Sequence, residues 1–269
     1  MPEVLEENSS STPPPSRLEQ MKSMSLIEHL EELRRRIIWA IVWVGIGFFF
    51  CWGYADRIFA YVQKPVIEAL HENKLPETLV YTNPTDPFNL YMKTGLVAGI
   101  FLASPFVLYQ VWLFIAPGLY RHEKRYVLPF MFSTVGLFLS GGFFGYKMVF
   151  PKALTFLISY GKQFTPMITV TEYTTLFLTI ILGLGVIFEM PILIFFLALM
   201  GIVSAKWLWR NLRYSILIIF IIAAVLTPTT DILNMCIFAA PMIALYVLSI
   251  GIAWLVHPAQ RKKRAQKQA

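Results

Sequence analysis

The chain has 269 residues, of which 57% are hydrophobic and 14% are charged. One water-soluble core of this size cannot bury so many apolar groups, so the composition excludes an ordinary soluble domain and indicates a membrane protein. The formal net charge is +7, which basic residues flanking membrane spans explain without a nucleic-acid partner. Two cysteines are too few for a disulfide framework or a metal site.

Residues 1–24 are expected to form a disordered cytoplasmic extension. Their glutamates, serines and three successive prolines cannot bury enough apolar surface to fold. The segment also lacks the basic start, short apolar core and cleavage site that characterise a secretory signal. A helix is predicted to begin near Leu26, because Ser25 and Glu28 form a capping box.

The start of this helix is predicted to be amphipathic. At 100° per residue, an apolar stripe lies opposite a charged face. The stripe contains Leu26, Leu30, Leu33 and Ile37, and the charged face contains Glu28, Glu31, Glu32 and Arg35. Each acid has a purely structural interpretation. Glu28 can act as a cap only, and Glu31 and Glu32 can pair with the arginines four residues on. Glu32 lies nearest the membrane surface, so it is also a candidate ligand contact.

Six apolar runs indicate membrane-spanning helices, because a span needs about 20 residues and continuous runs in lipid must be helical. The runs are Ile37–Tyr54, Phe88–Ile115, Val127–Val149, Leu176–Met200, Tyr214–Leu226 and Ile232–Val256. The fifth run would rise only about 20 Å as a helix, against about 30 Å of hydrocarbon. Pro228 is expected to end it and Asp231 to cap the sixth. The hairpin tip is therefore predicted to lie below the outer headgroups, unless Asn211 and Arg213 tilt in to lengthen the span.

The distribution of basic residues predicts the orientation. With the N-terminus in the cytoplasm, 16 of the 23 Lys and Arg residues lie inside and 7 lie outside or at span ends. Both ends are therefore expected in the cytoplasm, with one six-helix transmembrane domain at 25–256. Residues 257–269 form a basic tail, which is expected to lie at anionic lipid headgroups.

Glu189 is the only charged residue in the run Leu176–Met200, and Pro191 follows it. A carboxylate near the centre of a bilayer costs about 2.5–3.5 kcal/mol on insertion scales, so it marks a functional hypothesis. Because Pro191 frees the Ile187 carbonyl, one hypothesis is a proton-coupled small-solute transporter. The two halves of the chain show no matching repeat, which disfavours it.

An enzyme is not expected. His122 and Glu123 are not followed by a second histidine at metal-ligand spacing, and no phosphate loop or nucleophile elbow occurs. No cofactor is predicted.

Several motifs together resemble the TatC family, whose members are receptor subunits of the twin-arginine protein translocase. The matching stretches are His29–Arg34, Ser104–Tyr120, Arg121–Arg125, Phe188–Pro191 and Leu226–Pro228 followed by Asp231. The resemblance covers about residues 24 to 255.

The resemblance implies a concave all-α protein with six spans, both ends cytoplasmic, in the bacterial cytoplasmic membrane. Such proteins recognise signal peptides that carry two adjacent arginines, and the translocase moves folded cargo using the proton-motive force. Glu32 and Glu123 match the family positions implicated in binding the arginines, and Phe114 matches a neighbouring position. Arg34 and Arg36 are expected to hold the acids in place.

The family also implies TatA- and TatB-like single-span partners near the short last two helices, and a homo-oligomer within the complex. Thr227 matches a polar position there, whereas Met235 stands where many relatives have glutamine. Pro65 matches a recurrent position, for which a turn or helix start suffices. Glu189 would then form a polar wall of the concave face. A purely structural membrane scaffold is the third hypothesis.

Overall fold

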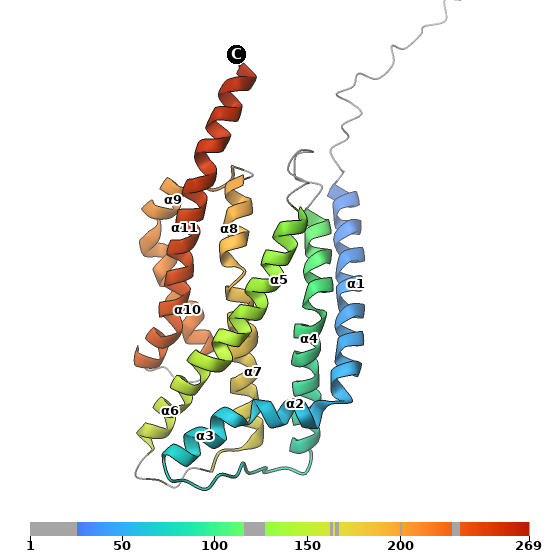
Figure 1. The fold of residues 1–269 in the computed structure, drawn as a ribbon, viewed down its shortest axis with the longest axis vertical. Helices are drawn as coiled ribbons and strands as arrows, with labels where there is room; N and C mark the ends of the chain where they lie inside the picture. Colours follow the sequence, from blue (N-terminus) through green and yellow to red (C-terminus); the bar gives the residue numbers. More distant parts are fainter. Residues whose placement is uncertain are drawn as a thin grey trace, which may run out of the picture.

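The computed structural model describes residues 26–115, 127–161, 164, 167–199, 201–227 and 232–268. This part of the chain is helical, and its extended pairing is limited to an isolated bridge between Val80 and Thr169. The helices, drawn in Figure 1, are α1 Leu26–Trp52, α2 Ala55–Val62, α3 Lys64–Glu72, α4 Asp86–Ile115, α5 Val127–Phe144, the π-helix η3 Gly145–Val149, α6 Phe150–Tyr160, α7 Val170–Ile187, α8 Met190–Leu199, α9 Ala205–Arg210, α10 Leu212–Leu226 and α11 Ile232–Gln268. The predicted all-α class is confirmed.

Four stretches of helix are long and apolar enough to cross a membrane. They are Glu28–Trp52, Asp86–Ile115, Val170–Leu199 and Met235–Trp254. The apolar α10 has 15 residues, so it rises about 22 Å, less than the hydrocarbon thickness of about 30 Å. It takes in Arg213, while Asn211 precedes it as the cap residue. α11 continues as a helix through the basic tail to Gln268.

The third predicted span extends beyond Val149. α5 passes through the π-helical turn η3 into α6, which ends at Tyr160, and Figure 1 shows α5 and α6 as one tilted arm. Pro151 lies in the first turn of α6, where a residue without an N–H is tolerated. The apolar run stopped at Val149 because Pro151 and Lys152 follow it, although most residues of α6 are apolar.

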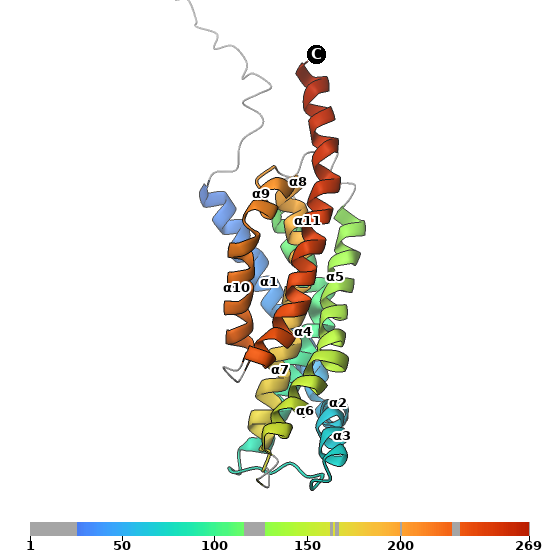
Figure 2. The ribbon, with the colours of Figure 1, turned by 90° about the vertical axis from the view of Figure 1, so that its left-hand side faces the viewer.

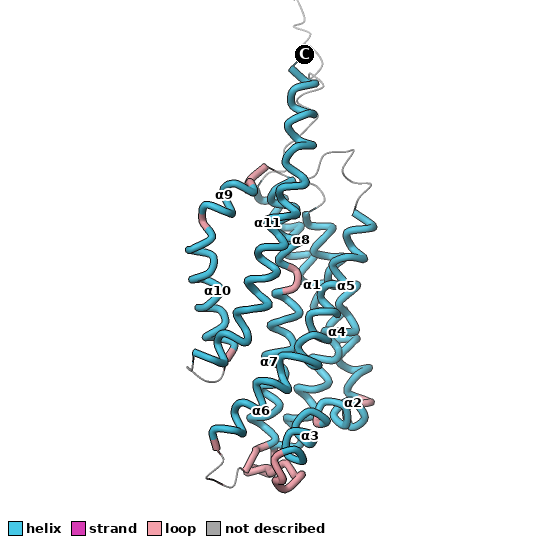
Figure 3. Tube along the Cα trace, turned by 60° about the vertical axis from the view of Figure 1, so that its left-hand side comes forward, coloured by secondary structure: helices cyan, strands magenta, loops and turns pink. Residues whose placement is uncertain are grey.

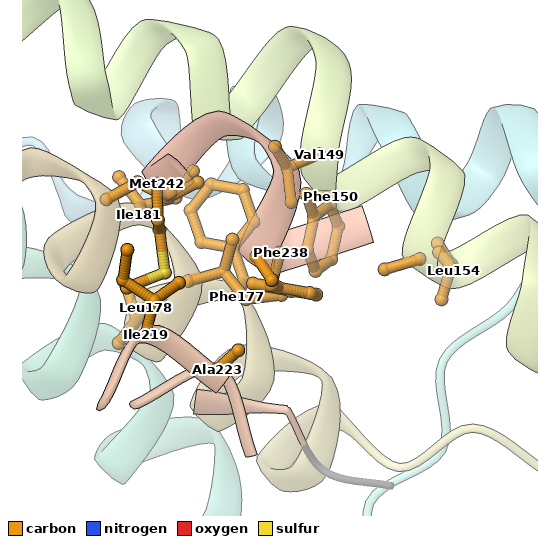
Figure 4. Packing of buried hydrophobic residues seen from close by; sticks show 14 of the residues in the cluster. Val149, Phe150, Leu154, Phe177, Leu178, Ile181, Ile219, Ala223, Phe238 and Met242 are labelled. Carbon is orange, nitrogen blue, oxygen red and sulfur yellow. The ribbon is translucent and has the colours of Figure 1, made fainter. Parts of the chain in front are cut away.

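The core forms around α7, which packs on α4, α5, η3 and α10. Figure 4 shows its buried side chains Phe177, Leu178 and Ile181 against Val149, Phe150, Ile219, Ala223, Phe238 and Met242. The rings of Phe150 and Phe177 meet edge to face, with centroids 5.0 Å apart. This packing joins α6 to the α10–α11 hairpin.

Two glycines let α1 and α4 approach closely. A Cβ on Gly47 would lie 2.5 Å from the Gly99 carbonyl oxygen, a distance that real side chains do not adopt. Small residues at a helix crossing allow backbones to touch. This contact fixes how the residues at the ends of α1 and α4 face one another.

A short helical cap lies at one end of the bundle. Pro65 is buried in the first turn of α3, and the hydroxyl of Tyr173 in α7 donates to the Val62 carbonyl in α2. Figures 1 and 2 show α2 and α3 at the opposite end from the start of α1 and the end of α11. The two described ends of the chain therefore lie at the same end of the bundle.

Candidate functional site

Glu32 is held by an ion pair where the first turns of α1 meet the last turns of α4. Nη2 of Arg36 lies 3.1 Å from Oε1 of Glu32, and the two side chains are 21% and 11% exposed, respectively. Nη1 of Arg36 donates to Oε1 of Gln110 in α4 at 3.4 Å. Gln110 and Arg36 therefore orient one oxygen of the Glu32 carboxylate.

The second carboxylate oxygen of Glu32 and the Nε atom of Arg36 are not used by this ion pair. Oε2 of Glu32 and Nε of Arg36 are both buried and have no hydrogen-bond partner among the described residues. A buried carboxylate oxygen without a donor is costly, and a bond from a charged donor recovers about 1.5–3 kcal/mol. The arrangement can therefore accept a further cationic N–H group.

A second contact between α1 and α4 lies beside Glu32. The rings of His29 and Phe114 stack with their centroids 4.4 Å apart and an interplanar angle of 21°. His29, Glu32 and Arg36 share one face of α1, and Phe114 follows Gln110 by one turn. Glu32 thus lies between two contacts that tie the helices together.

This helix face differs from the apolar stripe of α1. Leu30 and Ile37 are 62% and 48% exposed, so the stripe faces outward, as on a lipid-exposed helix. The face that carries His29, Glu32 and Arg36 turns toward α4. Glu31 and Arg35 form no ion pair in the described structure, so their proposed pairing is wrong, whereas Glu32 does pair with the arginine four residues on.

Glu189 occupies a break between two helices. α7 ends at Ile187 and α8 begins at Met190. Pro191 has no N–H, so the Ile187 carbonyl cannot receive the usual bond from four residues on. Oε1 of Glu189 is buried and has no hydrogen-bond partner among the described residues.

An apolar cavity brings Glu189 together with the stacked rings of His29 and Phe114. Its volume is about 500 Å³. The lining residues come from α1, α4, α5, the break before α8 and α8 itself: His29, Leu108, Val111, Trp112, Phe114, Ile115, Thr134, Glu189, Ile192, Leu193, Phe196 and Leu197. Nε1 of Trp112 donates to Oγ1 of Thr134 at 2.9 Å, which satisfies two of the polar groups in the wall. Glu189 and Phe114, given separate roles from the sequence, therefore share one cavity.

The remaining predicted residues lie elsewhere. Arg34 is exposed and forms no ion pair in the described part of the chain. Glu123 and Asp231 lie outside the described residues. Thr227 is 7% exposed and lines a second cavity, of about 630 Å³, between α6, α7 and the end of α10. Met235 is half-buried near the start of α11.

Sequence reasoning did not single out Gln110 or the aromatic partner role of His29. Gln110 is a lone amide in the apolar stretch of α4, one turn before Phe114, and only 9% exposed. The sequence did contain a signal for Gln110. It is a polar side chain in an apolar span, and its spacing places it on the same helix face as the candidate binding residue Phe114.

The family follows from comparison with known proteins. The family model described as Sec-independent protein translocase protein (TatC) matches residues 28–241. The chain belongs to the TatC family. The TatC protein of Koribacter versatilis is 68% identical over 250 residues, which are 93% of this chain and 92% of that protein. The TatC protein of Carboxydothermus hydrogenoformans is 36% identical, with 88% of this chain and 96% of that protein covered.

Solved structures of TatC show the same fold. The crystal structure of the twin-arginine translocase receptor TatC matches with a TM-score of 0.77 at 34% identity, covering 85% of this chain and 99% of that one. A second crystal structure, in the detergent DDM, agrees equally well. As a TatC protein, the chain is a component of the Sec-independent protein translocase with several apolar helices suited to the membrane. The small-solute transporter hypothesis finds no support among these relatives.

Proposed function

We propose that this chain is the receptor that binds twin-arginine signal peptides, and the core subunit of the translocase. The observation that carries the proposal is the Glu32 carboxylate, with one oxygen held by Arg36 and the other buried without a donor among the described residues. Beside it is an apolar cavity under the stacked rings of His29 and Phe114.

The chemistry favours arginine as the ligand of Glu32. A guanidinium has a planar fork of donors and keeps its charge when partly desolvated, whereas an ammonium is compact and strongly hydrated. Because Arg36 already neutralises Glu32, two incoming arginines need a further carboxylate. Glu123, which follows the end of α4 in the sequence, is proposed to supply it.

The cavity is proposed to receive the apolar side chain that follows the two arginines. Burying one large aliphatic or aromatic side chain yields about 1.5–3 kcal/mol, comparable with one charged hydrogen bond to a buried group. Both parts of a signal peptide then contribute similar free energy, and Glu189 supplies a polar wall deeper in the cavity.

The proposed receptor has six spans, with both ends in the cytoplasm of a bacterial cell and the cap of α2 and α3 outside. The excess of basic residues on the proposed inner side supports this orientation. It brings Glu32, at the start of α1, to the cytoplasmic membrane surface, where a signal peptide of folded cargo arrives.

Single-span subunits resembling TatA and TatB are proposed to dock near α10 and the start of α11, within an oligomeric complex driven by the proton-motive force. α10 is too short to span the hydrocarbon unaided, and such mismatch favours helix association. The cavity at Thr227 contains threonines of α7, which offer hydroxyls to a polar residue in a partner helix.

A binding measurement tests the receptor role. The purified full chain in detergent is titrated with a fluorescent peptide carrying Arg-Arg and with its Lys-Lys counterpart. Replacing Glu32 by Gln should weaken binding of the Arg-Arg peptide by about tenfold or more, as expected for loss of one charged hydrogen bond. Glu31→Gln, one residue away and exposed, is the matched control and should stay within about twofold of the wild type. Equal losses in both variants, or equal binding of the two peptides, would contradict the proposal.

A further inference from the structure

A narrow apolar slot lies between α9 and α11, away from the proposed peptide site. Its volume is about 380 Å³, and its walls are Trp209 of α9 and Val247, Ile250, Gly251 and Trp254 of α11. The α11 residues follow the spacing i, i+3, i+4 and i+7, so they share one helix face. Figures 1 and 3 show α9 beside α11, close to the end of the bundle where the chain ends.

Hydrogen bonds hold the two walls of the slot together. The Tyr246 hydroxyl, in α11, donates to the Leu208 carbonyl of α9 at 3.0 Å and accepts a bond from Oγ of Ser215 at 2.8 Å. Leu208 is 4% exposed, which adds apolar packing beneath the same contact. The slot is therefore a preformed feature of the fold.

The slot is open because of one glycine. A Cβ on Gly251 would meet no atom within 4 Å, so a side chain at this position would fill the space rather than strain the backbone. Trp209 and Trp254 are 63% and 68% exposed on either side. Tryptophan rings in such positions are typical of the boundary between hydrocarbon and headgroups.

The surroundings of the slot are strongly basic. Lys206 precedes Trp209 by three residues, and Arg210 and Arg213 follow it; all three side chains are exposed. α9, α10 and α11 contain eight Lys or Arg residues and no acid: Lys206, Arg210, Arg213, Arg261, Lys262, Lys263, Arg264 and Lys267. The helices that line the slot, and α10 between them in the chain, thus carry only positive charge, which complements an acyl chain with a negative headgroup.

We propose that this slot binds an anionic phospholipid, with an acyl chain against Gly251 between the two tryptophans and the phosphate at Lys206, Arg210 and Arg213. The proposed orientation of the chain places this lipid in the cytoplasmic leaflet. The rest of the inference does not depend on that orientation. A lipid bound there would hold α9 and the basic end of α11 at the membrane surface.

Native mass spectrometry of the purified full chain tests the proposal. The protein is titrated in detergent with phosphatidylglycerol or phosphatidylcholine, and the fraction that retains one lipid is measured. The wild type should retain phosphatidylglycerol at about tenfold lower lipid concentration than phosphatidylcholine, given the three basic residues proposed to contact the phosphate. Gly251→Leu should abolish this tight binding. Arg210→Gln should weaken the binding of phosphatidylglycerol by about fivefold and leave the binding of phosphatidylcholine unchanged.

Gly136→Leu is the matched control, because Gly136 is also an exposed helical glycine whose Cβ would meet no atom within 4 Å. It should bind phosphatidylglycerol like the wild type. Equal retention of the two lipids, or undiminished retention by Gly251→Leu, overturns the proposal. So does an outcome in which Gly251→Leu loses a co-purified single-span partner and keeps its lipid. Denaturant unfolding of the same preparations shows that each variant is folded, so a failure of signal-peptide binding addresses the proposed receptor role alone.

Discussion

Glu32 and Glu189 are both half-buried carboxylates of the proposed site, and the fold treats them in opposite ways. Glu32 has a cation at 3.1 Å, which Gln110 in turn holds from α4. Glu189 lies in a helix break against an apolar cavity, with no cation within ion-pair distance among the described residues. In the proposed function the first acid presents its charge to a ligand, and the second supplies a polar wall.

The contact between α1 and α4 explains why Glu32 can be held so well. The two helices touch through Gly47 and Gly99, which brings Arg36 within reach of Gln110, 74 residues away in the chain. The break at Glu189 requires only its neighbour Pro191. One region therefore depends on packing between distant residues, and the other is set locally.

The largest expected effect comes from separating α1 from α4. In Gly47→Leu the new side chain would start 2.5 Å from a backbone oxygen of α4, so we expect a loss of about 3 kcal/mol of unfolding free energy, at the upper end of overpacking effects. Binding of the Arg-Arg peptide should fall with it. Gly45→Leu, two residues earlier where a Cβ meets nothing within 4 Å, is the control. Denaturant unfolding in detergent measures both, and equal stability of the two variants would refute the close contact.

A smaller effect on peptide binding is expected when Arg36, the cation paired with Glu32, is replaced. Arg36→Gln frees the Glu32 carboxylate, and ordering such a side chain again on binding costs about 0.5–1.5 kcal/mol. The affinity for the Arg-Arg peptide should therefore fall about threefold to tenfold, with partial recovery in Arg36→Lys. Tighter binding in Arg36→Gln would show instead that Arg36 competes with the ligand. Titration of the fluorescent peptide distinguishes the two signs.

The charge of Glu189 should matter less than that of Glu32. Glu189→Gln keeps the hydrogen-bonding atoms and the shape, so we expect peptide affinity and transport within about threefold of the wild type, the limit set by a neutral hydrogen bond. Transport of a reporter cargo into the periplasm measures it. A loss as large as that of Glu32→Gln would remove the difference between the two acids.

The smallest effect should come from an exposed ion pair in the cap. Nδ1 of His71 lies 2.6 Å from Oε1 of Glu77, and this hydrogen bond raises the pKa of His71 above its usual value. Because the folded pKa is the higher one, the pair stabilises the fold below the unfolded pKa and loses this contribution as pH rises through the folded pKa. His71→Asn should therefore lower the unfolding midpoint slightly near pH 5, and leave it unchanged near pH 9, on either side of the usual histidine pKa of about 6.5. An equal shift at both pH values would contradict the contribution of the pair.

The helices and the break at Glu189 were largely predictable because their causes are local. A run of apolar residues forces helix in lipid, and a proline two residues after Glu189 interrupts one. The third apolar run ends at Val149 in the sequence because Pro151 and Lys152 follow it, whereas the helix continues through a π turn into α6.

The arrangement of the candidate site could be predicted only in part. Glu32 and Phe114 were identified through motifs, and the pairing of Glu32 with Arg36 follows from helical spacing. The same spacing suggested a pair between Glu31 and Arg35 that does not form; both of these side chains are exposed, whereas Gln110 of α4 orients Arg36.

The sequence alone determined that this is a helical membrane protein, that α10 is short and that an isolated acid lies beside Pro191. These features could be predicted because hydrophobicity and backbone chemistry act over a few residues. Only the tertiary structure decided that Gln110 orients Arg36, that His29 stacks on Phe114, and that Glu189 shares their cavity. These contacts depend on which face each helix turns to its neighbour, and that is set by side-chain packing summed over the bundle. The slot at Gly251 is of the same kind, because this exposed glycine lies in a slot only where Trp209 of α9 packs beside α11.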